Sequence, residues 1–371
     1  MNRFPCVIMR GGTSKAVCFK SEDMPENRLD WEAFLLDVMG SPDVKQIDGL
    51  GGANSLTSKV AIIGVSDEDG IDLDYTFAQV SLNQSIVDMK GNCGNISSVV
   101  APFAVEQELI EVDKQAISKK IIIKNTNTKK IIEAEIRVEN GMYVPEGNHE
   151  IPGVPGSGSK IEMVFHGAEG AVTGKLLPTE NTTDIVRTSK GDVRISIVDS
   201  ANPLVFIEAS SIGLKGTELP SELSKEVLDY IEEIRGKSAE LCGFSVASKA
   251  TLESPAVPKA TIVSKSKSFV DMKGRHYSED EMDLTVRMMS MQKPHQALAI
   301  TGAVCISSAA KIKGTLVYEL VDSKKDGFKI AHPSGIMSTV VEMNQDRVKA
   351  VKVTRTARRI MQGDVFTHKN Y

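Results

Sequence analysis

The sequence predicts a mixed α+β fold in which two similar domains each curl a mostly antiparallel sheet around one buried helix. Three observations lead to this prediction. Strand-like runs mostly follow one another along the chain, which disfavours a doubly wound parallel sheet. Two helical runs are small or apolar throughout, as a helix buried on all sides requires. The two halves of the chain also repeat one layout of turns and helices.

Length and composition set the outer limits. A chain of 371 residues is long for one core, so two domains are expected. A net charge of −5 disfavours a general nucleic-acid-binding role. The N-terminus lacks the apolar core of a signal peptide, and no apolar run is long enough to span a bilayer. We therefore expect a cytoplasmic protein with no membrane association.

Five cysteines lie far apart, with no C-x-x-C pair among them. This odd and sparse set indicates reduced thiols rather than a disulfide framework or a zinc site. The chain also lacks a dinucleotide fingerprint, a G-x-S-x-G elbow and an H-E-x-x-H pair. The sequence therefore predicts a site with no metal and no cofactor.

The first half is expected to be rich in strands. The polar turn 125–128 joins two β-branched runs into a predicted hairpin. One helix is expected at 31–39, where apolar residues fall on one face and Asp30 is placed to cap the start, and a buried helix at 96–109. The expected strands of this half are 6–9, 15–20, 59–64, 75–82, 121–124, 131–138 and 161–165.

The second half is expected to contain an amphipathic helix at 221–241 and a small, apolar helix at 296–310. The strands expected around them are 193–198, 204–209, 284–289, 315–320, 336–342 and 350–353. Expected domains are 1–187 and 188–371, with a C-terminal strand near 355–371 that can return to the first domain.

Each half opens with strands around a polar turn, at 10–14 and 199–203, and each later leads a glycine-containing turn into its buried helix. Two such domains would bring both helix N-termini to a shared cleft. Facing sets of backbone N–H donors suit a small polyanion.

The most informative stretch is Gly91-Asn92-Cys93-Gly94-Asn95, directly before the first buried helix. Unpaired backbone N–H groups and the helix dipole stabilise negative charge there, which makes a thiolate available as a base or nucleophile. The alternative is a buried structural cysteine beside a tight turn.

Four motifs lie in order along essentially the whole chain: Met9-Arg10-Gly11-Gly12-Thr13-Ser14-Lys15, Gly91-Asn92-Cys93-Gly94-Asn95, Asp199-Ser200-Ala201-Asn202-Pro203 and Arg355-Thr356-Ala357-Arg358-Arg359. Together they resemble the PrpF family. That family groups 2-methylaconitate cis-trans isomerases with methylitaconate Δ-isomerases and oxalomesaconate tautomerases. The resemblance implies a diaminopimelate-epimerase-like fold of two pseudo-symmetric domains.

The resemblance also implies site residues. In the family a lysine and a cysteine face the substrate, and these match Lys59 and Cys93; Ser14 and His295 fall in the family's pocket. Without the motif match, Lys59 would be read as a solvent lysine at a strand start. The remaining expected substrate contacts, from the motifs and turns, are Arg10, Gly12, Thr13, Asn92, Gly94, Asn95, Ser200, Thr301, Gly302 and Ala303.

One departure from the wider superfamily is informative. The amino-acid epimerases of this fold use two cysteines that face each other across the α-carbon. Here the second turn has only Cys305, after the glycine and expected inside the helix as a buried structural thiol. A symmetric two-thiol racemase is therefore disfavoured.

The function predicted is a cofactor-independent proton shift or cis-trans isomerisation of an unsaturated di- or tricarboxylate such as 2-methylaconitate. Lys59 is the expected proton abstractor and Cys93 the group that returns the proton, with the reverse assignment nearly as well supported. Arg10 is expected to contact a carboxylate, or alternatively to form a salt bridge at the strand end.

Two other functions stay open at this stage. The protein could be an accessory partner of an iron–sulfur dehydratase, although it has no cluster-ligating cysteine pattern. It could also be a two-base amino-acid epimerase, which would require a second reactive thiol. A homo-oligomer is compatible with this size, but the sequence carries no interface signal.

Overall fold

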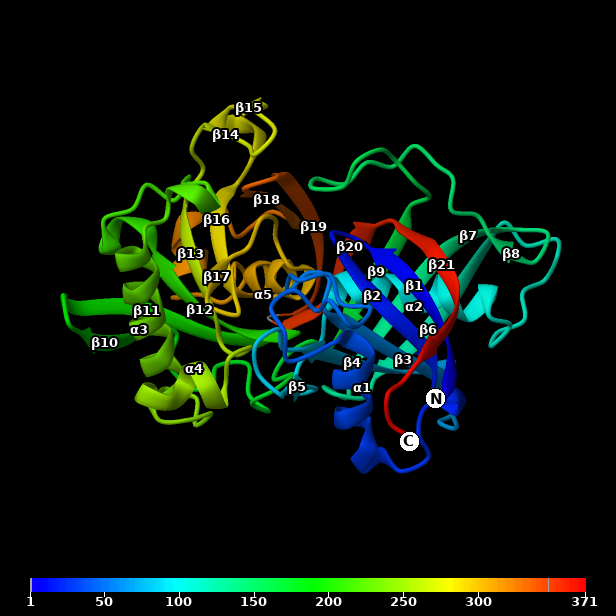
Figure 1. Cartoon of the computed structure of the whole chain (residues 1–371). Helices are drawn as coiled ribbons and strands as arrows, with labels where there is room; N and C mark the ends of the chain where they lie inside the picture. Colours follow the sequence, from blue (N-terminus) through cyan, green and yellow to red (C-terminus); the bar gives the residue numbers. More distant parts are fainter. Residues whose placement is uncertain (1, 346) are drawn as a thin grey trace. The chain divides into compact units, whose positions relative to one another are not determined.

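The computed structural model describes residues 2–345 and 347–371. The chain forms two compact units: the first comprises residues up to Val164 together with Thr354–Tyr371, and the second comprises Phe165–Val353. Each is a sheet with one buried helix, so the predicted α+β class is confirmed (Figure 1).

The first unit contains α1 (Trp31–Met39) and α2 (Gly94–Glu106). Two 3₁₀ turns, Ser21–Asp23 and Arg28–Asp30, precede α1. Its strands are β1 (Arg3–Gly11), β2 (Ser14–Lys20), β3 (Lys59–Val65), β4 (Leu73–Val80), β5 (Val87–Asp88), β6 (Ser118–Asn125), β7 (Ile131–Glu139), β8 (Met142–Tyr143), β9 (Ile161–His166), which runs across the boundary, and β21 (Ala357–Phe366).

Antiparallel pairs dominate this sheet. β1 pairs with β2 and with β21, β3 with β4, and β6 with β7, while β2–β3 and β4–β6 are parallel. The strands curl around α2, which packs against β1, β2, β3, β4, β7, β8 and β21 (Figure 1). The predicted 121–138 hairpin is present, and its turn is closed by Asn125 Oδ1, which accepts from the Thr128 N–H at 2.9 Å.

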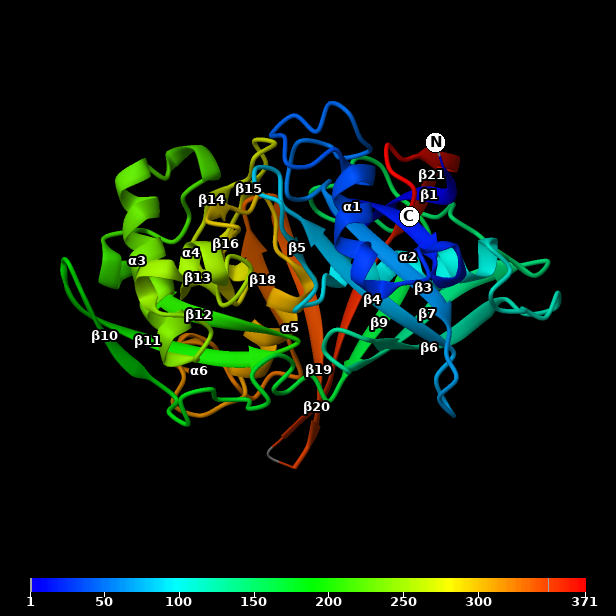
Figure 2. The same cartoon turned by 60° about the horizontal axis from the view of Figure 1, so that its bottom comes forward.

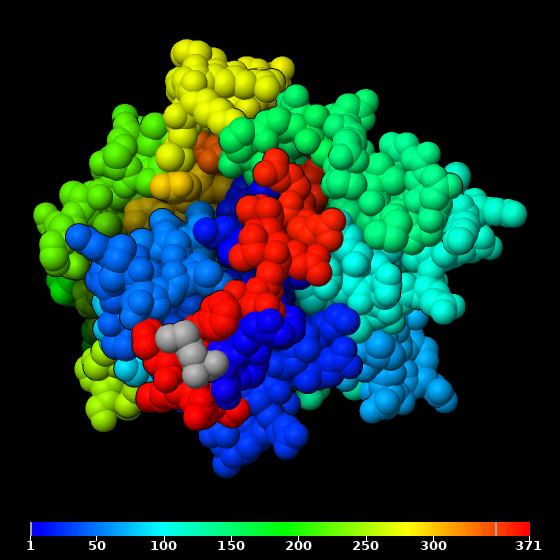
Figure 3. Space-filling view, turned by 45° about the vertical axis from the view of Figure 1, so that its right-hand side comes forward, coloured from blue at the N-terminus to red at the C-terminus, as the bar shows by residue number. Residues whose placement is uncertain are grey.

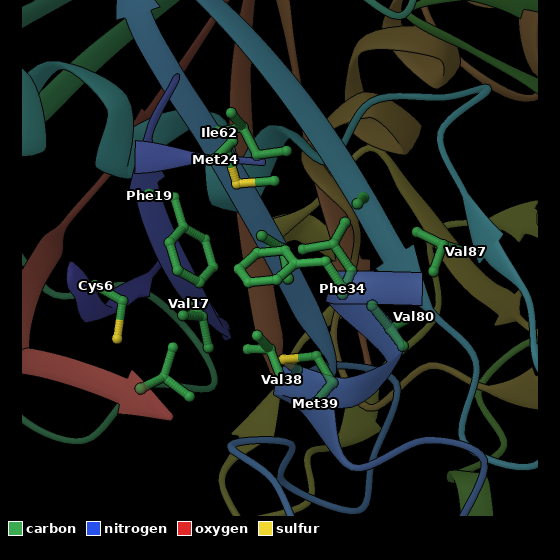
Figure 4. Packing of buried hydrophobic residues seen from close by; sticks show 14 residues of the cluster. Cys6, Val17, Phe19, Met24, Phe34, Val38, Met39, Ile62, Val80 and Val87 are labelled. Carbon is green, nitrogen blue, oxygen red and sulfur yellow. The ribbon is translucent and has the colours of Figure 1, made fainter. Parts of the chain in front are cut away.

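The ring of Phe34 on α1 joins the two ends of the first unit. It makes edge-to-face contacts with Phe4, Phe19 and Tyr371, with ring centroids 4.7, 5.5 and 5.4 Å away. Figure 4 shows Phe34 pointing into the cluster between Phe19 and Val38. The C-terminal segment lies beside the N-terminal residues on this face of the unit (Figure 3).

The second unit carries α3 (Lys225–Leu241), α4 (Ala250–Glu253), α5 (Ile300–Ala309) and α6 (Leu316–Leu320). Its strands are β10 (Asp184–Thr188), β11 (Gly191–Ser200), β12 (Asn202–Glu208), β13 (Lys259–Lys265), β14 (Phe269–Val270), β15 (His276–Tyr277), β16 (Leu284–Ser290), β17 (Lys293–Pro294), β18 (Gly327–His332), β19 (Gly335–Asn344) and β20 (Arg347–Arg355), whose last two residues belong to the first unit. Four 3₁₀ turns, Ala209–Ile212, Pro220–Glu222, Ala247–Lys249 and Glu279–Glu281, complete it.

The helix α5 is the buried helix of this unit. It packs against β11, β12, β18 and β19, while α3 lies against β10 and β13 (Figure 2). In the part of the chain that the structure describes, no helix is long and apolar enough to cross a membrane.

The boundary between the units differs from the predicted one between residues 187 and 188. The loop after β9 already belongs to the second unit because its backbone bonds to β11 and the turn that follows: the N–H groups of Gly170 and Ala201 donate to Asp199 O and Ala168 O at 2.8 and 2.7 Å. The C-terminal strand β21 pairs with β1 along nine residues from Arg3 to Gly11.

One local prediction is wrong and one is confirmed only in part. The predicted strand at 315–320 is instead the helix Leu316–Leu320, because the Thr315 hydroxyl accepts from the Tyr318 N–H and caps α6. Asp30 is the N-cap residue of α1, as predicted, but its side chain makes no capping hydrogen bond; Asn27 Oδ1 accepts from the Leu29 N–H and caps the preceding 3₁₀ turn.

Replacement of Phe34 by alanine should lower the free energy of unfolding by about 3–5 kcal/mol, because a fully buried ring with three aromatic neighbours is lost. Urea denaturation measures this. The control Leu29→Ala, at a side chain that is 87% exposed, should change stability by less than about 0.5 kcal/mol. Equal effects of the two variants would contradict the packing described.

Candidate active site

Cys93 stands at the start of α2. It is the N-cap residue, with extended backbone (φ −117°, ψ 99°), and its carbonyl accepts the Ser97 N–H at 2.8 Å. The N–H groups of Gly94 and Asn95 therefore precede the first intrahelical bond and lie at the positive end of the helix dipole. The Cys93 thiol is partly exposed, whereas three of the other cysteines are buried. Its predicted position is confirmed.

The β1–β2 turn closes directly onto this helix start. A Cβ on Gly11 would lie 2.4 Å from Asn95 O, and one on Gly12 would lie 2.2 Å from Asn95 Oδ1. Gly12 also adopts φ +50°, which favours glycine. Asn95 Nδ2 donates to Thr13 Oγ1 at 3.1 Å. The two glycines thus allow the predicted residues of the turn and of the helix to meet.

The hydroxyl of Ser14 is buried beside this turn. Ser14 is 3% exposed, and among the described residues its Oγ has no hydrogen-bond partner. It pairs with Gly11 across the turn. Because buried hydroxyls normally find partners, this oxygen is available to a ligand.

Arg10 holds the turn rather than a carboxylate side chain. Its Nη1 donates to the carbonyls of Gly12 and Thr356 at 3.2 and 2.7 Å. Burial lowers its pKa from the usual value. These two hydrogen bonds explain the placement of Arg10 without a salt bridge at the strand end. The predicted contact of Arg10 with a substrate carboxylate stays a prediction.

Asn92 braces the helix start. Its Oδ1 accepts from the Ser97 Oγ at 3.1 Å, and the same hydroxyl lies 3.1 Å from the Cys93 carbonyl. The Asn92 side chain is therefore directed to the first turn of α2, where it fixes the backbone around Cys93.

Lys59 is buried, not a solvent lysine. It opens β3, is 6% exposed, and its Nζ donates to Gln79 Oε1 at 2.5 Å. The Nζ also lies 5.3 Å from the centroid of the Phe77 ring, within the range of a cation–π contact. The alternative of an exposed lysine is excluded.

Lys59 and Cys93 interact electrostatically. Burial lowers the pKa of the Lys59 ammonium, and the negative charge of a Cys93 thiolate acts in the opposite direction and raises it. Burial is the larger of the two causes. The pKa of Lys59 is therefore set mainly by its burial and secondly by the charge of Cys93.

In the second unit, His295 precedes α5. Its Nδ1 accepts from the Ala297 N–H at 2.9 Å, so the neutral ring carries its proton on Nε2 as a donor. The backbone N–H of His295 donates to Met288 O at 2.8 Å.

The residues Thr301, Gly302 and Ala303 lie inside the first turn of α5 rather than in a turn before it. The Ala303 N–H is used by the helix, since it donates to Ala299 O at 2.9 Å. The predicted Ala303 contact through this amide is therefore wrong. The N–H groups of Thr301 and Gly302 precede the first intrahelical bond, as those of Gly94 and Asn95 do in α2.

Ser200 does not join this helix start. Its Oγ lies 2.8 Å from Ser308 Oγ, two turns further along α5 from Thr301. Cys305 is fully buried within α5, its Sγ lies 3.2 Å from Val198 O, and burial raises the pKa of its thiol. The residue that caps α5 in the position Cys93 has on α2 is Ala299.

Sequence reasoning missed Gln79 and gave Arg355 no role. The Nε of Arg355 donates to Asn95 Oδ1 at 3.1 Å and its Nη1 donates to Thr354 O at 2.7 Å. Burial lowers the pKa of Arg355 to about 9. The motif 355–359 was the only signal for the arginine; a glutamine within a strand gave none for Gln79.

Over the described ranges, 2–345 and 347–371, no three His, Cys, Asp or Glu side chains group so as to hold a metal ion. What the first unit assembles is a buried amine, a thiol at a helix start, a free hydroxyl and backbone donors. Such a set can move protons and stabilise developing negative charge.

A family model described as "PrpF protein" matches residues 1–368. A Bacillus subtilis (strain 168) protein, YraM, named only as a candidate isomerase, is 52% identical over 364 residues, 98% of this chain and 97% of that protein. The 3-methylitaconate isomerase of Eubacterium barkeri is 43% identical, covering 99% and 98%. The 2-methyl-aconitate isomerase of Cupriavidus necator is 33% identical, covering 97% and 96%.

Two solved structures agree with these sequence matches. A crystal structure of methylitaconate-delta-isomerase superposes with a TM-score of 0.81 at 42% identity and covers 99% of this chain and 96% of its own. A hydroxyproline epimerase from Agrobacterium vitis shares the fold alone, with a TM-score of 0.59 at 10% identity, over 98% of this chain and 92% of its own. The epimerase-like fold predicted from the sequence is confirmed.

The variant Gly12→Ala should lower the free energy of unfolding by about 2–4 kcal/mol, the sum of left-handed strain and overlap with Asn95 Oδ1. The matched control Gly70→Ala has a similar positive φ, +79°, but open space around it, and should cost only about 1 kcal/mol. Thermal unfolding monitored by circular dichroism compares them. A Gly12 variant no worse than the Gly70 variant would show that the turn does not close on α2.

Proposed function

The chain belongs to the PrpF family and is an isomerase, and we propose that it shifts a proton in an unsaturated di- or tricarboxylate such as 2-methylaconitate. The reaction, a cis-trans isomerisation or a double-bond migration, needs no cofactor in this proposal and takes place in the cytoplasm.

The observation that carries the proposal is the pairing of a buried amine with a thiol at a helix start. Burial lowers the pKa of Lys59 from 10.5, which favours the neutral amine that a base must be. The Cys93 thiol lies where backbone N–H groups stabilise its anion. Each group can therefore exchange a proton with a substrate in either direction.

The first step breaks a C–H bond next to the substrate's double bond. The Lys59 amine takes the proton and becomes an ammonium, and the electron pair spreads into the conjugated carboxylate as a dienolate. The bond between the former alkene carbons then has less double-bond character and can rotate. This step places growing negative charge on the carboxylate oxygens, so its rate depends on donors around them.

The second step returns a proton to carbon. Cys93 gives its thiol proton either to the original carbon after rotation, which is a cis-trans isomerisation, or to the far carbon, which moves the double bond. The thiolate is then reprotonated by the Lys59 ammonium, which restores both groups. One proton is removed and one returned in each turnover.

The carboxylates need donors in a chain of net negative charge. The Ser14 hydroxyl, the N–H groups of Gly94 and Asn95, and the Thr13 hydroxyl surround the helix start and suit this task. Gly12 contributes the close backbone approach, and Asn92 fixes the loop. His295, Thr301 and Gly302 stay proposed substrate contacts, and a substrate contact by Ser200 is not part of the proposal.

The names of the relatives support the substrate class. They specify 3-methylitaconate, a dicarboxylate, and 2-methylaconitate, a tricarboxylate. Both acids carry an acidic C–H next to a double bond conjugated with a carboxylate, which is the unit that the proposed base attacks. A two-thiol epimerase mechanism is disfavoured, since Ala299 occupies the cap position of α5.

The variants Lys59→Met and Cys93→Ala should each lower kcat by at least about 100-fold, the usual contribution of a positioned acid or base. In deuterium oxide they should differ. Cys93→Ala should still exchange the allylic proton of 2-methylaconitate for deuterium, because Lys59 removes and returns it. Lys59→Met should neither exchange nor isomerise. NMR spectroscopy of the substrate measures both rates.

Exposed Lys45 and half-buried Cys242 offer matched controls, and Lys45→Met and Cys242→Ala should keep the parental rates. If Lys59→Met still exchanges while Cys93→Ala does not, the two roles are reversed. If both variants isomerise at the parental rate, the proposed mechanism fails.

A further inference from the structure

The register of β3 and β4 places Gln79 directly opposite Lys59. The two residues are paired partners in this antiparallel ladder, so their side chains leave the same face of the sheet. Phe77, two residues before Gln79, lies on that face as well. A single strand thus supplies both the hydrogen-bond acceptor and the aromatic ring that contact the Lys59 amine.

The amide of Gln79 can be oriented in only one way. Its Nε2 donates to the carbonyls of Ser58 and Ser55 at 2.9 and 3.2 Å. Both are acceptors, so the nitrogen must face them and Oε1 must face Lys59 Nζ. Gln79 is 8% exposed, which keeps water from competing for these contacts.

A neutral acceptor at this place has a chemical consequence. The amide oxygen takes one N–H of the amine and leaves the lone pair pointing in a fixed direction. A carboxylate would instead stabilise the ammonium and keep the lysine protonated. The titratable group that acts on Lys59 is Cys93, from the start of α2, while β4 presents only the neutral Gln79 and Phe77.

We propose that Gln79 is the positioning residue of the catalytic base: its amide orients the Lys59 amine and, by being uncharged, leaves that amine free to exchange a proton. This inference rests on the proposed function of Lys59.

A purely structural role would look different. Gln79 also fastens the loop 46–58 through the Ser55 and Ser58 carbonyls, and a variant could act by loosening that loop. Gln46 provides the matched control. Its Nε2 donates to Ser58 Oγ at 2.7 Å and its Oε1 accepts from Ala53 N at 3.1 Å, so it fastens the same loop through contacts that do not involve Lys59.

The test compares Gln79→Glu, Gln79→Leu and Gln46→Leu in the full chain. Two quantities are measured for each: the pKa of Lys59, by NMR of protein labelled with ¹³C at the lysine ε-carbons and assigned with Lys59→Met, and the pH profile of kcat with 2-methylaconitate. The first readout does not depend on activity.

Gln79→Glu should raise the pKa of Lys59 by about 1–3 units, the effect of an adjacent opposite charge. The low-pH limb of the kcat profile should move up by the same amount, since activity requires the unprotonated amine. Gln79→Leu should lower the Lys59 pKa, because the ammonium loses an acceptor, and should reduce the plateau of kcat on the order of 100-fold through loss of orientation. Gln46→Leu should lower the melting temperature and leave both pKa and profile in place.

The inference is overturned if both Gln79 variants leave the titration of Lys59 unchanged, or if Gln46→Leu moves it equally. Should the Lys59 titration move while the kcat profile stays, Gln79 does control the amine but Lys59 is not the base. That result would contradict the proposed function of Lys59 and leave the contact between Gln79 and Lys59 supported. Because Gln79→Glu conserves shape, it keeps the test valid if Gln79→Leu does not fold.

Discussion

The structure depends on one constraint: in each unit a single sheet curls around a helix, so that helix has no face directed to water. Every residue of α2 from Gly94 to Val105 is buried, and so is every residue of α5. Charged side chains would be costly there, and polar side chains of the two helices bond within the protein, as Ser98 does to Asn95 O at 2.7 Å and Ser308 does with Ser200 at 2.8 Å. The backbone N–H groups that such a helix leaves unpaired lie at its start.

This constraint explains where the candidate site lies in the first unit. The start of α2 brings together the Cys93 thiol and backbone N–H groups, and the β1–β2 turn closes on it through two glycines. The same burial surrounds Lys59 with Gln79 and Phe77 instead of water. Burial thereby lowers the pKa of a lysine that would be a permanent cation at the surface, as the proposed base requires.

Much of the fold and of the candidate site could be predicted from the sequence, because some local patterns of residues indicate the structure around them. The helix 31–39 was predicted to the residue, since its apolar residues fall on one face; the structure adds that Gly40 ends it in a left-handed conformation. Cys93 was found through its neighbours, which a turn into a helix requires. The motif resemblance identified Lys59, but neither its burial nor its partner.

What failed depended on tertiary contacts. Residues 315–320 form a helix because Thr315 caps it within the packed unit, although the run itself is compatible with a strand. Ser200 was placed by analogy between the two halves, yet its hydroxyl turns to Ser308. The sequence contained no sign of a role for Gln79, since its contact with Lys59 comes from the strand register that sets the two residues opposite each other.

The most direct measurement of the proposed mechanism is to incubate the purified protein, alone and treated with chelator, with 2-methylaconitate in deuterium oxide and to follow the acid by NMR. The proposed mechanism predicts isomerisation with deuterium entering at the carbon that receives the returned proton. No turnover without an added metal or partner protein, or isomerisation with no deuterium in the product, would contradict it.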